Sequence, residues 1–188
     1  MTMPDDTICA ISTPPGTGGI AVARISGPKA LETAQRIWMG KRPITEAAAN
    51  TCLVGSVTDT RGEELDQAVA TVFRAPRSFT GEDVVELSVH GSKWVQQELI
   101  MALIGAGARI AEPGEFSRRA FASGRMDLAQ TEAVADIIAS GSRAAQRVAL
   151  RQMRGDFSKR IEDMRGQLLE LAALLELELD FSEEDVEF

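Results

Sequence analysis

The chain has 188 residues, a length that allows one ordinary domain with an extension but not a large multidomain enzyme. Its 20 lysines and arginines against 28 aspartates and glutamates give a net charge of −8, which argues against a polyanion held by the whole surface unless positive charge gathers locally. With no signal-peptide pattern at the start and no segment as long as a membrane span, the sequence predicts a cytoplasmic protein without a membrane partner.

Short β-rich runs separated by turn residues fill the first half of the chain. They predict five strands, in TICAI (7–11), GIAVARIS (19–26), CLVGSVT (52–58), AVATVFR (68–74) and VVELSVH (84–90). Apolar residues at helical spacing predict helices over 28–38 and 92–107, and a short sixth strand is expected at 109–112. The N-terminal part is therefore predicted to be α+β, with a mixed sheet and two to three helices.

After Pro113 the pattern becomes helical. Helices are predicted over 127–140 and 143–153, and beyond them a narrow heptad stripe requires a partner helix. This stripe consists of Phe157, Ile161, Met164, Leu168, Leu171 and Leu175. Residues 176–188 carry seven acids and no base, which we interpret as a solvated linker leading into a longer protein. We predict two domains, residues 1–118 and 119–188.

The glycine-rich run TPPGTGGIAVARISG (13–27) fits a permissive dinucleotide pattern, but a β-rich run follows the glycines where that motif requires a helix. We interpret the glycines as shaping a tight turn, or as letting a ligand or another backbone segment come close, rather than as binding phosphate. Cys9 and Cys52 are predicted to be small core residues rather than a disulfide, and with a single histidine the chain offers no metal site.

Side chains in the strands predicted at 19–26 and 84–90 point alternately to two faces. One face of each strand is plainly apolar, and Arg24 and Glu86 lie on the other face. Either this face is solvent-exposed and the two residues simply pair, or it forms a ligand pocket in which a molecule with two parallel N–H donors binds Glu86. His90 as a general base with Cys9 or Ser12 as nucleophile is disfavoured, so no catalytic residue is assigned.

Two basic groups remain open to interpretation. Arg125 lies just before a predicted helix, where an anionic partner would be favourable, although a salt bridge to Glu115 or Asp127 is equally compatible with the sequence. Arg143, Arg147, Arg151 and Arg154 recur at steps of four, four and three along one helix face. This stripe is suited to RNA phosphates, but a solvated face paired with nearby acids is the favoured interpretation.

Three stretches, DTICAISTPPGTGGIAVARISG (6–27), PRSFTGEDVVELSVHG (76–91) and PGEFSRRAFASGRMDLAQTEAVADII (113–138), resemble the N-terminal part of the tRNA-modification GTPases called MnmE or TrmE. The resemblance covers essentially the whole chain. It implies a folate-binding domain similar to that of the glycine-cleavage T protein, followed by the first part of a helical domain. The folate contacts of the family fall on Arg24, Glu86 and Arg125, with 5-formyltetrahydrofolate or a related one-carbon tetrahydrofolate as the cofactor. The family often has Lys at the last position.

The resemblance also implies a homodimer and a reaction at carbon five of the wobble uridine of tRNA, carried out with an FAD-dependent partner called MnmG or GidA. GTP, Mg²⁺ and K⁺ would act in a separate GTPase domain. The 188 residues contain neither the Gly-Lys-Ser loop of that domain nor the C-terminal Cys-x-Gly-Lys tail of the family. Two alternatives are kept: a stand-alone folate-dependent one-carbon transferase, and a pure assembly module in which Arg24 and Glu86 form a structural pair.

Overall fold

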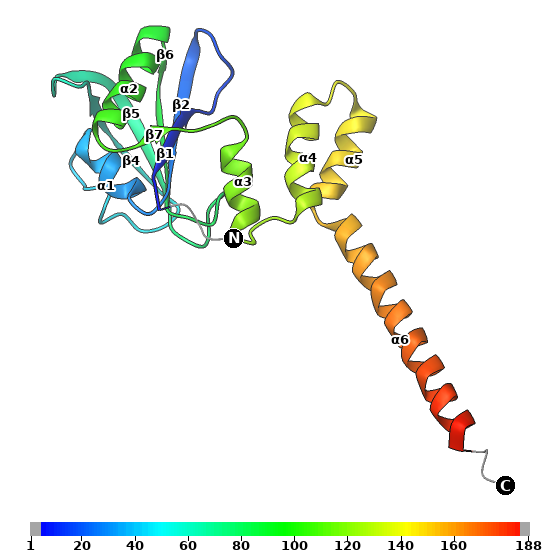
Figure 1. Ribbon diagram of the computed structural model, residues 1–188. Coiled ribbons are helices and arrows are strands. Elements are labelled where there is room, and N and C mark those ends of the chain that lie inside the picture. Colours follow the sequence, from blue (N-terminus) through cyan, green and yellow to red (C-terminus); the bar gives the residue numbers. More distant parts are fainter. Residues whose placement is uncertain (1–4, 185–188) are drawn as a thin grey trace. The chain divides into compact units, whose positions relative to one another are not determined.

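The computed structural model describes residues 5–184 and separates into two compact units between Met126 and Asp127 (Figure 1). The first unit holds a seven-stranded sheet with helices α1 (Ala30–Arg36), α2 (Lys93–Gly105) and α3 (Glu115–Ala122), and the second unit consists of helices. This arrangement confirms the predicted α+β class. The structural division lies later than the boundary predicted at 118/119, which falls inside α3.

The sheet is mixed, with the strand order β3-β4-β5-β6-β2-β1-β7. Neighbouring strands are antiparallel except for the parallel pair of β1 and β7. The strands are β1 (Ile8–Ile11), β2 (Gly18–Ser26), β3 (Trp38–Gly40), β4 (Thr51–Thr58), β5 (Glu64–Phe73), β6 (Val84–Gly91) and β7 (Arg109–Ile110). The six predicted strands are present, and β3 is an addition: the helix expected over 28–38 ends at Arg36, and Trp38 pairs with Val57 instead.

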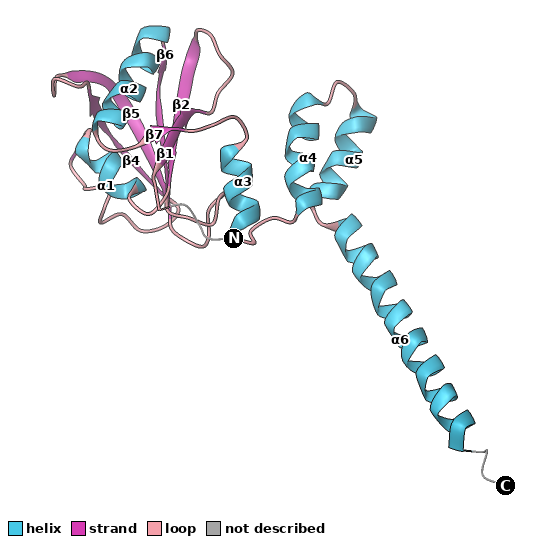
Figure 2. Ribbon diagram, in the orientation of Figure 1, coloured by secondary structure: helices cyan, strands magenta, loops and turns pink. Residues whose placement is uncertain are grey.

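The core of the first unit lies between one face of the sheet and helices α1 and α2 (Figure 2). Residues two apart in β2 and β6 alternate between this core and the opposite face, as the period of a strand requires. The buried positions are Ala21, Ala23, Ile25, Val85, Leu87 and Val89. Cys9 is also in this core, whereas Cys52 is exposed on the other face beside Thr71, so the core prediction for Cys52 is wrong. Both cysteines are free thiols.

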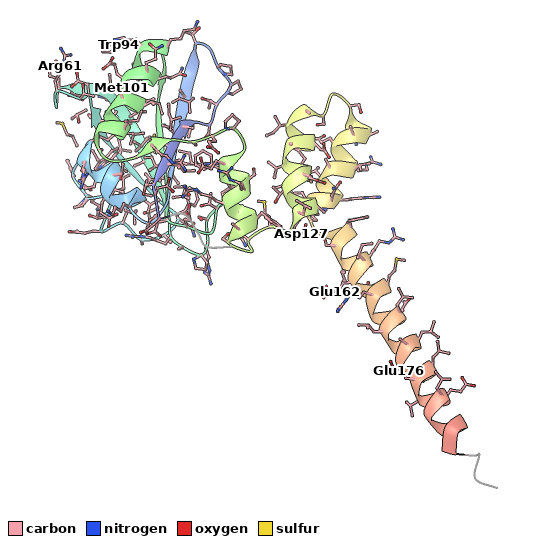
Figure 3. The ribbon with its side chains drawn as sticks, viewed as in Figure 1. Arg61, Trp94, Met101, Asp127, Glu162 and Glu176 are labelled. Carbon is pink, nitrogen blue, oxygen red and sulfur yellow. The ribbon has the colours of Figure 1, made fainter. Side chains whose placement is uncertain are left out.

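The second unit contains α4 (Leu128–Ala139), α5 (Arg143–Met153) and α6 (Asp156–Glu184). Helix α4 begins after Asp127, which is labelled in Figure 3. A capping box forms there: the Asp127 carboxylate accepts from the Gln130 backbone at 2.8 Å, and the Gln130 side chain accepts from the Asp127 backbone at 2.9 Å. Helices α4 and α5 pack side by side and bury Ala133 and Ala149. No helix among residues 5–184 is long and apolar enough to cross a membrane.

Helix α6 is longer than expected. Its end at Glu184 means that residues 176–184 are helical rather than linker, and residues 185–188 lie outside the described part. Leucine and glutamate, which alternate there, are both strong helix formers, and this outweighs the repulsion among the acids. The predicted heptad stripe is exposed along α6, with values between 50% at Ile161 and 65% at Leu168.

Candidate functional site

Arg24 and Glu86 lie directly opposite each other on β2 and β6, on the sheet face turned away from α1 and α2. The Glu86 carboxylate oxygen Oε1 accepts from Arg24 Nε at 2.8 Å and lies 2.7 Å from Arg24 Nη2. The side chains are 24% and 25% exposed, so both are largely shielded from water. Glu86 Oε2 and Arg24 Nη1 have no hydrogen-bond partner among the described residues. The ion pair therefore leaves one acceptor, Glu86 Oε2, and one donor group, Arg24 Nη1, available to a ligand.

Two aromatic rings hold the Arg24 guanidinium in place. Its central carbon lies 4.9 Å from the ring centre of Phe79 and 5.6 Å from that of Phe116, within cation–π range. Phe79 comes from the loop between β5 and β6, and Phe116 comes from α3. The sheet, this loop and α3 thus converge on one arginine.

The end of α3 positions Arg125. Gly124 has a φ of +71°, the left-handed conformation of a helix C-terminus, and the Arg125 backbone N–H then donates to the Ala120 carbonyl at 2.9 Å. The Arg125 side chain donates from Nε to the carbonyl of Ser78 at 3.2 Å and makes no ion pair within residues 5–184. The salt bridge considered from the sequence is therefore absent in the described part of the chain.

Gly81 allows the loop between β5 and β6 to approach this helix end. A Cβ atom added to it would lie 2.7 Å from Ser123 Oγ, and its φ of +80° also disfavours a side chain. Ser123 Oγ donates to the carbonyl of Thr80 at 2.7 Å. The close contact keeps Arg125 beside the loop that carries Phe79.

The three residues predicted as site residues line one cavity of about 390 Å³. This volume is within the range of small-molecule sites. Arg24, Glu86 and Arg125 are joined there by Asn50, Phe73, Arg77, Ser78, Phe79, Val84 and Met126. Sequence reasoning did not single out Asn50, Arg77 or Phe79, although the last two belong to the PRSFTGED stretch that carries the family resemblance.

The lining suits a flat molecule with polar ends. Phe73, Phe79 and Val84 offer apolar walls, while Glu86 is the one carboxylate among three arginines that include Arg77 and Arg125. A ring with adjacent N–H donors can bind Glu86, and oxo or carboxylate groups can bind the arginines.

A buried ion cluster fixes α3 to the sheet beside this cavity. Arg119, with a side chain only 1% exposed, lies 3.1 Å from Glu82, 3.1 Å from Glu115 and 2.7 Å from Asp6. Arg109 forms a two-point pair with Glu115, with donor to acceptor distances of 2.8 and 2.6 Å, and also contacts Asp6. Arg119, the second arginine in SRRAF, is thus structural, a role that the sequence alone did not distinguish from ligand binding.

The cluster shifts the acidity of its carboxyl groups. Hydrogen bonds from Arg109, reinforced by the Glu112 backbone and Arg119, outweigh burial and lower the pKa of Glu115 to about 2. Burial opposes ionisation of Asp6, but the hydrogen bonds from Arg109 and Arg119 are together stronger and lower its pKa. Both groups therefore stay ionised at neutral pH and hold the arginines.

His90 and Cys9 do not form a catalytic arrangement. His90 is 72% exposed, and its Nδ1 lies 2.7 Å from Asp66 Oδ1 on the outer face. Cys9 is fully buried in the core, and this burial raises the pKa of its thiol to about 11. The thiol is neutral and inaccessible, so it is not suited to act as a nucleophile.

Two family models match the chain in succession. The model described as GTP-binding protein TrmE N-terminus matches residues 7–125, and the model described as MnmE helical domain matches residues 128–188. The chain belongs to the TrmE/MnmE family. The two matches meet close to the structural division between Met126 and Asp127.

Curated MnmE proteins agree with this assignment. The chain is 52% identical to the tRNA modification GTPase MnmE of Parabacteroides distasonis, over 97% of the chain and 40% of the relative. It is 52% identical to that of Cytophaga hutchinsonii and 50% identical to that of Salinibacter ruber, again over 97% of the chain and over 39% and 40% of the relatives. The chain therefore spans about 40% of the length of these MnmE proteins.

Proposed function

We propose that this chain is the folate-binding and homodimerising region of a GTPase that modifies tRNA. The observation that supports the proposal most directly is the cavity that gathers Arg24, Glu86 and Arg125. These three residues come from β2, β6 and the end of α3, far apart in the sequence, and they are the positions to which the family resemblance assigns folate contacts.

In this proposal Glu86 recognises the pterin of 5-formyltetrahydrofolate or a related one-carbon tetrahydrofolate. A pterin presents an amino group and a ring N–H side by side, and a carboxylate accepts such a pair in a fork. Arg24 orients the carboxylate through Oε1, so in the fork the free Oε2 accepts one N–H of the ligand and Oε1 is shared between Arg24 and the other N–H. Arg24 Nη1 is the donor for the pterin oxo group, and the exposed Arg125 is the donor for the glutamate carboxylates of the folate.

The remaining elements of the proposal concern the longer protein. With an FAD-dependent partner of the MnmG or GidA type, the protein would modify the wobble uridine of tRNA at carbon five. GTP, Mg²⁺ and K⁺ would bind outside the 188 residues, in which no Gly-Lys-Ser/Thr sequence occurs. The relatives named above are called tRNA modification GTPases, which supports this assignment of substrate and nucleotide.

One observation favours a second candidate, the pure assembly module. Arg24 and Glu86 pair directly, as a purely structural pair would. The stand-alone one-carbon transferase has no comparable support, because His90 is bound to Asp66 and Cys9 is buried.

Calorimetric titration with 5-formyltetrahydrofolate separates these functions. We expect the wild-type chain to bind, and Glu86→Gln to bind at least about tenfold more weakly, because a neutral amide replaces one charged acceptor with a donor. Glu32→Gln is the matched control, because Glu32 is exposed on α1 and makes no ion pair among residues 5–184. Absence of binding by the wild-type chain would support the assembly module, and equal affinities for the wild type and Glu86→Gln would refute the role of Glu86 in recognising the pterin. Sedimentation of the same samples at micromolar concentration should show a dimer, and a strict monomer would refute the homodimer.

A further inference from the structure

The second unit carries a basic surface that the folate proposal does not use. We define the α5–α6 basic surface by Arg143, Arg147 and Arg151 on α5, by Arg154 at the C-cap of α5, and by Lys159 and Arg160 on α6. All six side chains are exposed, and none of them makes an ion pair or a hydrogen bond within the described residues. Between positions 143 and 160 the only acid is Asp156. Positive charge is thus gathered locally in a chain whose net charge is −8.

Packing determines which side of α5 carries the arginines. Ala149, at 3% exposure, is the residue of α5 that is buried against α4. At 100° per residue, the arginine positions fall on the opposite side of the helix from Ala149. They run over about 16 Å of helix, from the 1.5 Å rise per residue. Four guanidinium groups therefore form a straight row that points away from the helix pair.

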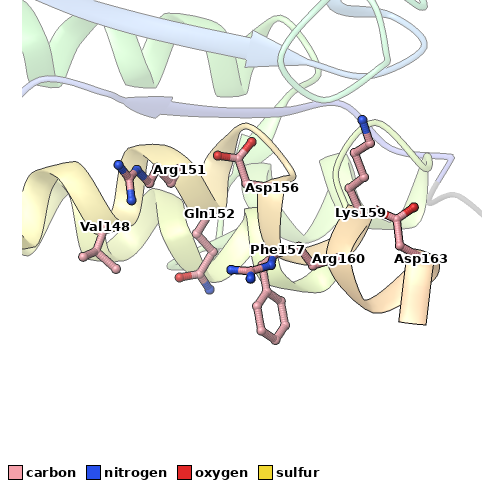
Figure 4. A pocket seen from close by; sticks show the side chains of 8 residues that line it. All are labelled: Val148, Arg151, Gln152, Asp156, Phe157, Lys159, Arg160 and Asp163. Atoms are coloured by element: carbon pink, nitrogen blue, oxygen red, sulfur yellow. The ribbon is translucent and has the colours of Figure 1, made fainter. Parts of the chain in front are cut away.

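The surface continues around the junction of α5 and α6. Val148, Arg151, Gln152, Phe157, Lys159 and Arg160 line a hollow of about 590 Å³ there, together with Asp156 and Asp163 (Figure 4). Phe157 is 58% exposed, and its ring projects away from the ribbon. An exposed ring beside cations is the combination on which unpaired bases stack.

We propose that the α5–α6 basic surface binds RNA through its phosphate backbone, with Phe157 as a contact for an unpaired base. The proposal rests on the function proposed above, since it assigns the tRNA of that function to a surface of this chain. Five of the six basic residues are arginines, whose planar guanidinium binds phosphate oxygens at two points. The sequence favoured a solvated face whose arginines pair with nearby acids. No such ion pairs are present in the described part of the chain.

An acidic polypeptide is the competing partner for such a row. RNA is favoured because an exposed aromatic ring accompanies the cations and because the relatives are named as enzymes of tRNA modification. The row would then contribute to affinity rather than to sequence recognition, since phosphate contacts carry no base information.

The test is fluorescence anisotropy of a labelled, unmodified tRNA transcript with the 188-residue chain at a series of salt concentrations. The test variant replaces Arg143, Arg147, Arg151 and Arg154 with Gln, which retains helix propensity. The control variant replaces Lys29, Lys41, Arg42 and Lys93 with Gln, which removes the same charge from exposed positions of the first unit. Circular dichroism checks that both variants are folded.

We expect the test variant to bind at least about tenfold more weakly and its plot of log affinity against log salt to be shallower by about 3, close to one per lost phosphate contact. The control variant should stay within about twofold of the wild type. The proposal is overturned if the wild type does not bind, if both variants lose affinity equally, or if polyglutamate displaces the wild type as readily as unlabelled tRNA does.

Titration of the same proteins with 5-formyltetrahydrofolate tests the proposed folate binding independently of RNA binding. The test variant should bind the folate as the wild type does, because no residue of the α5–α6 basic surface lines the folate cavity. RNA binding without folate binding would refute the folate proposal alone, and folate binding without RNA binding would refute the RNA surface alone.

Discussion

The two units use their arginines in opposite ways. In the first unit, arginines form ion pairs that join segments distant in the sequence, and Arg119 is the most deeply buried of them. In the second unit, all seven basic residues lack an ion pair within the described chain. Residue type alone therefore does not distinguish a structural arginine from one available to a partner; a facing carboxylate marks a structural arginine only where the pair is fully buried, as it is at Arg119.

The apolar residues show the same contrast. The first unit has a core of leucines, isoleucines and valines between its sheet and two helices. Within the described part of the second unit, the buried apolar residues are the two alanines at 133 and 149. Helical propensity and capping must contribute much of the local stability of such helices, since little apolar surface is buried. We expect substitutions of the same kind to have large effects in the first unit and small ones in the second.

The largest expected effect is that of Arg119→Met. Removing this guanidinium leaves Glu82 and Glu115 buried without their partner, which should lower the free energy of unfolding by about 3–5 kcal/mol. Urea unfolding followed by tryptophan fluorescence measures this change for the first unit, because both tryptophans, Trp38 and Trp94, lie in it.

Arg151→Met is the matched control in the second unit, where urea unfolding is followed by circular dichroism because both tryptophans lie in the first unit. The side chain is exposed and unpaired in the described chain, so its loss should change stability by less than about 0.5 kcal/mol. If Arg119→Met and Arg151→Met lowered the free energy of unfolding by similar amounts, the contrast between the units would be refuted.

An intermediate effect is expected from acid. The pKa of Glu115 is about 2 in the folded chain against an ordinary 4.5, so its stabilising contribution is complete above pH 4.5 and is lost as the pH falls toward 2. This contribution is about 3 kcal/mol. Urea unfolding at several pH values should show the decline, and Glu115→Gln should be less stable at neutral pH with a flatter pH dependence. Parallel pH profiles for the two proteins would show that the decline has another origin.

The smallest expected effect is that of Asp127→Ala in the second unit. The substitution removes the capping box of α4 and should cost about 1 kcal/mol. Thermal melts followed by circular dichroism at a helical wavelength measure it. Asp136→Ala removes an acid from the exposed side of the same helix without touching a cap, and should leave the melt nearly unchanged. If Asp136→Ala lowered the melting temperature as much as Asp127→Ala does, the loss of charge rather than the loss of the cap would be responsible.

Local patterns predicted much of the first unit. The period of two correctly separated the Arg24 and Glu86 face from the core face, because alternation is a property of each strand alone. Strand β3 was missed because Trp38 also fits the helical spacing of α1, and only its pairing with Val57 decides between the two. Pairing across the sheet is not visible in a local window.

The residues that line the cavity were predicted in part. The resemblance named Arg24, Glu86 and Arg125, but the walls formed by Phe79 and Asn50 depend on how the loop after β5 and the segment before β4 fold over the sheet. In the same way, the sequence could not assign Arg119 to a buried cluster, because its partners Asp6 and Glu82 are far away in the chain. Long-range contacts of this kind arise only from the complete fold.

The strand order has a consequence for behaviour at high concentration. The two edges of the sheet are formed by β3 with three residues and β7 with two, the shortest strands that the structure describes. A long, flat edge presents unpaired backbone groups on which a further strand can grow, and short edge strands are one of the ways in which natural sheets prevent this. The two short edges therefore offer few backbone groups on which a second copy of the sheet could pair.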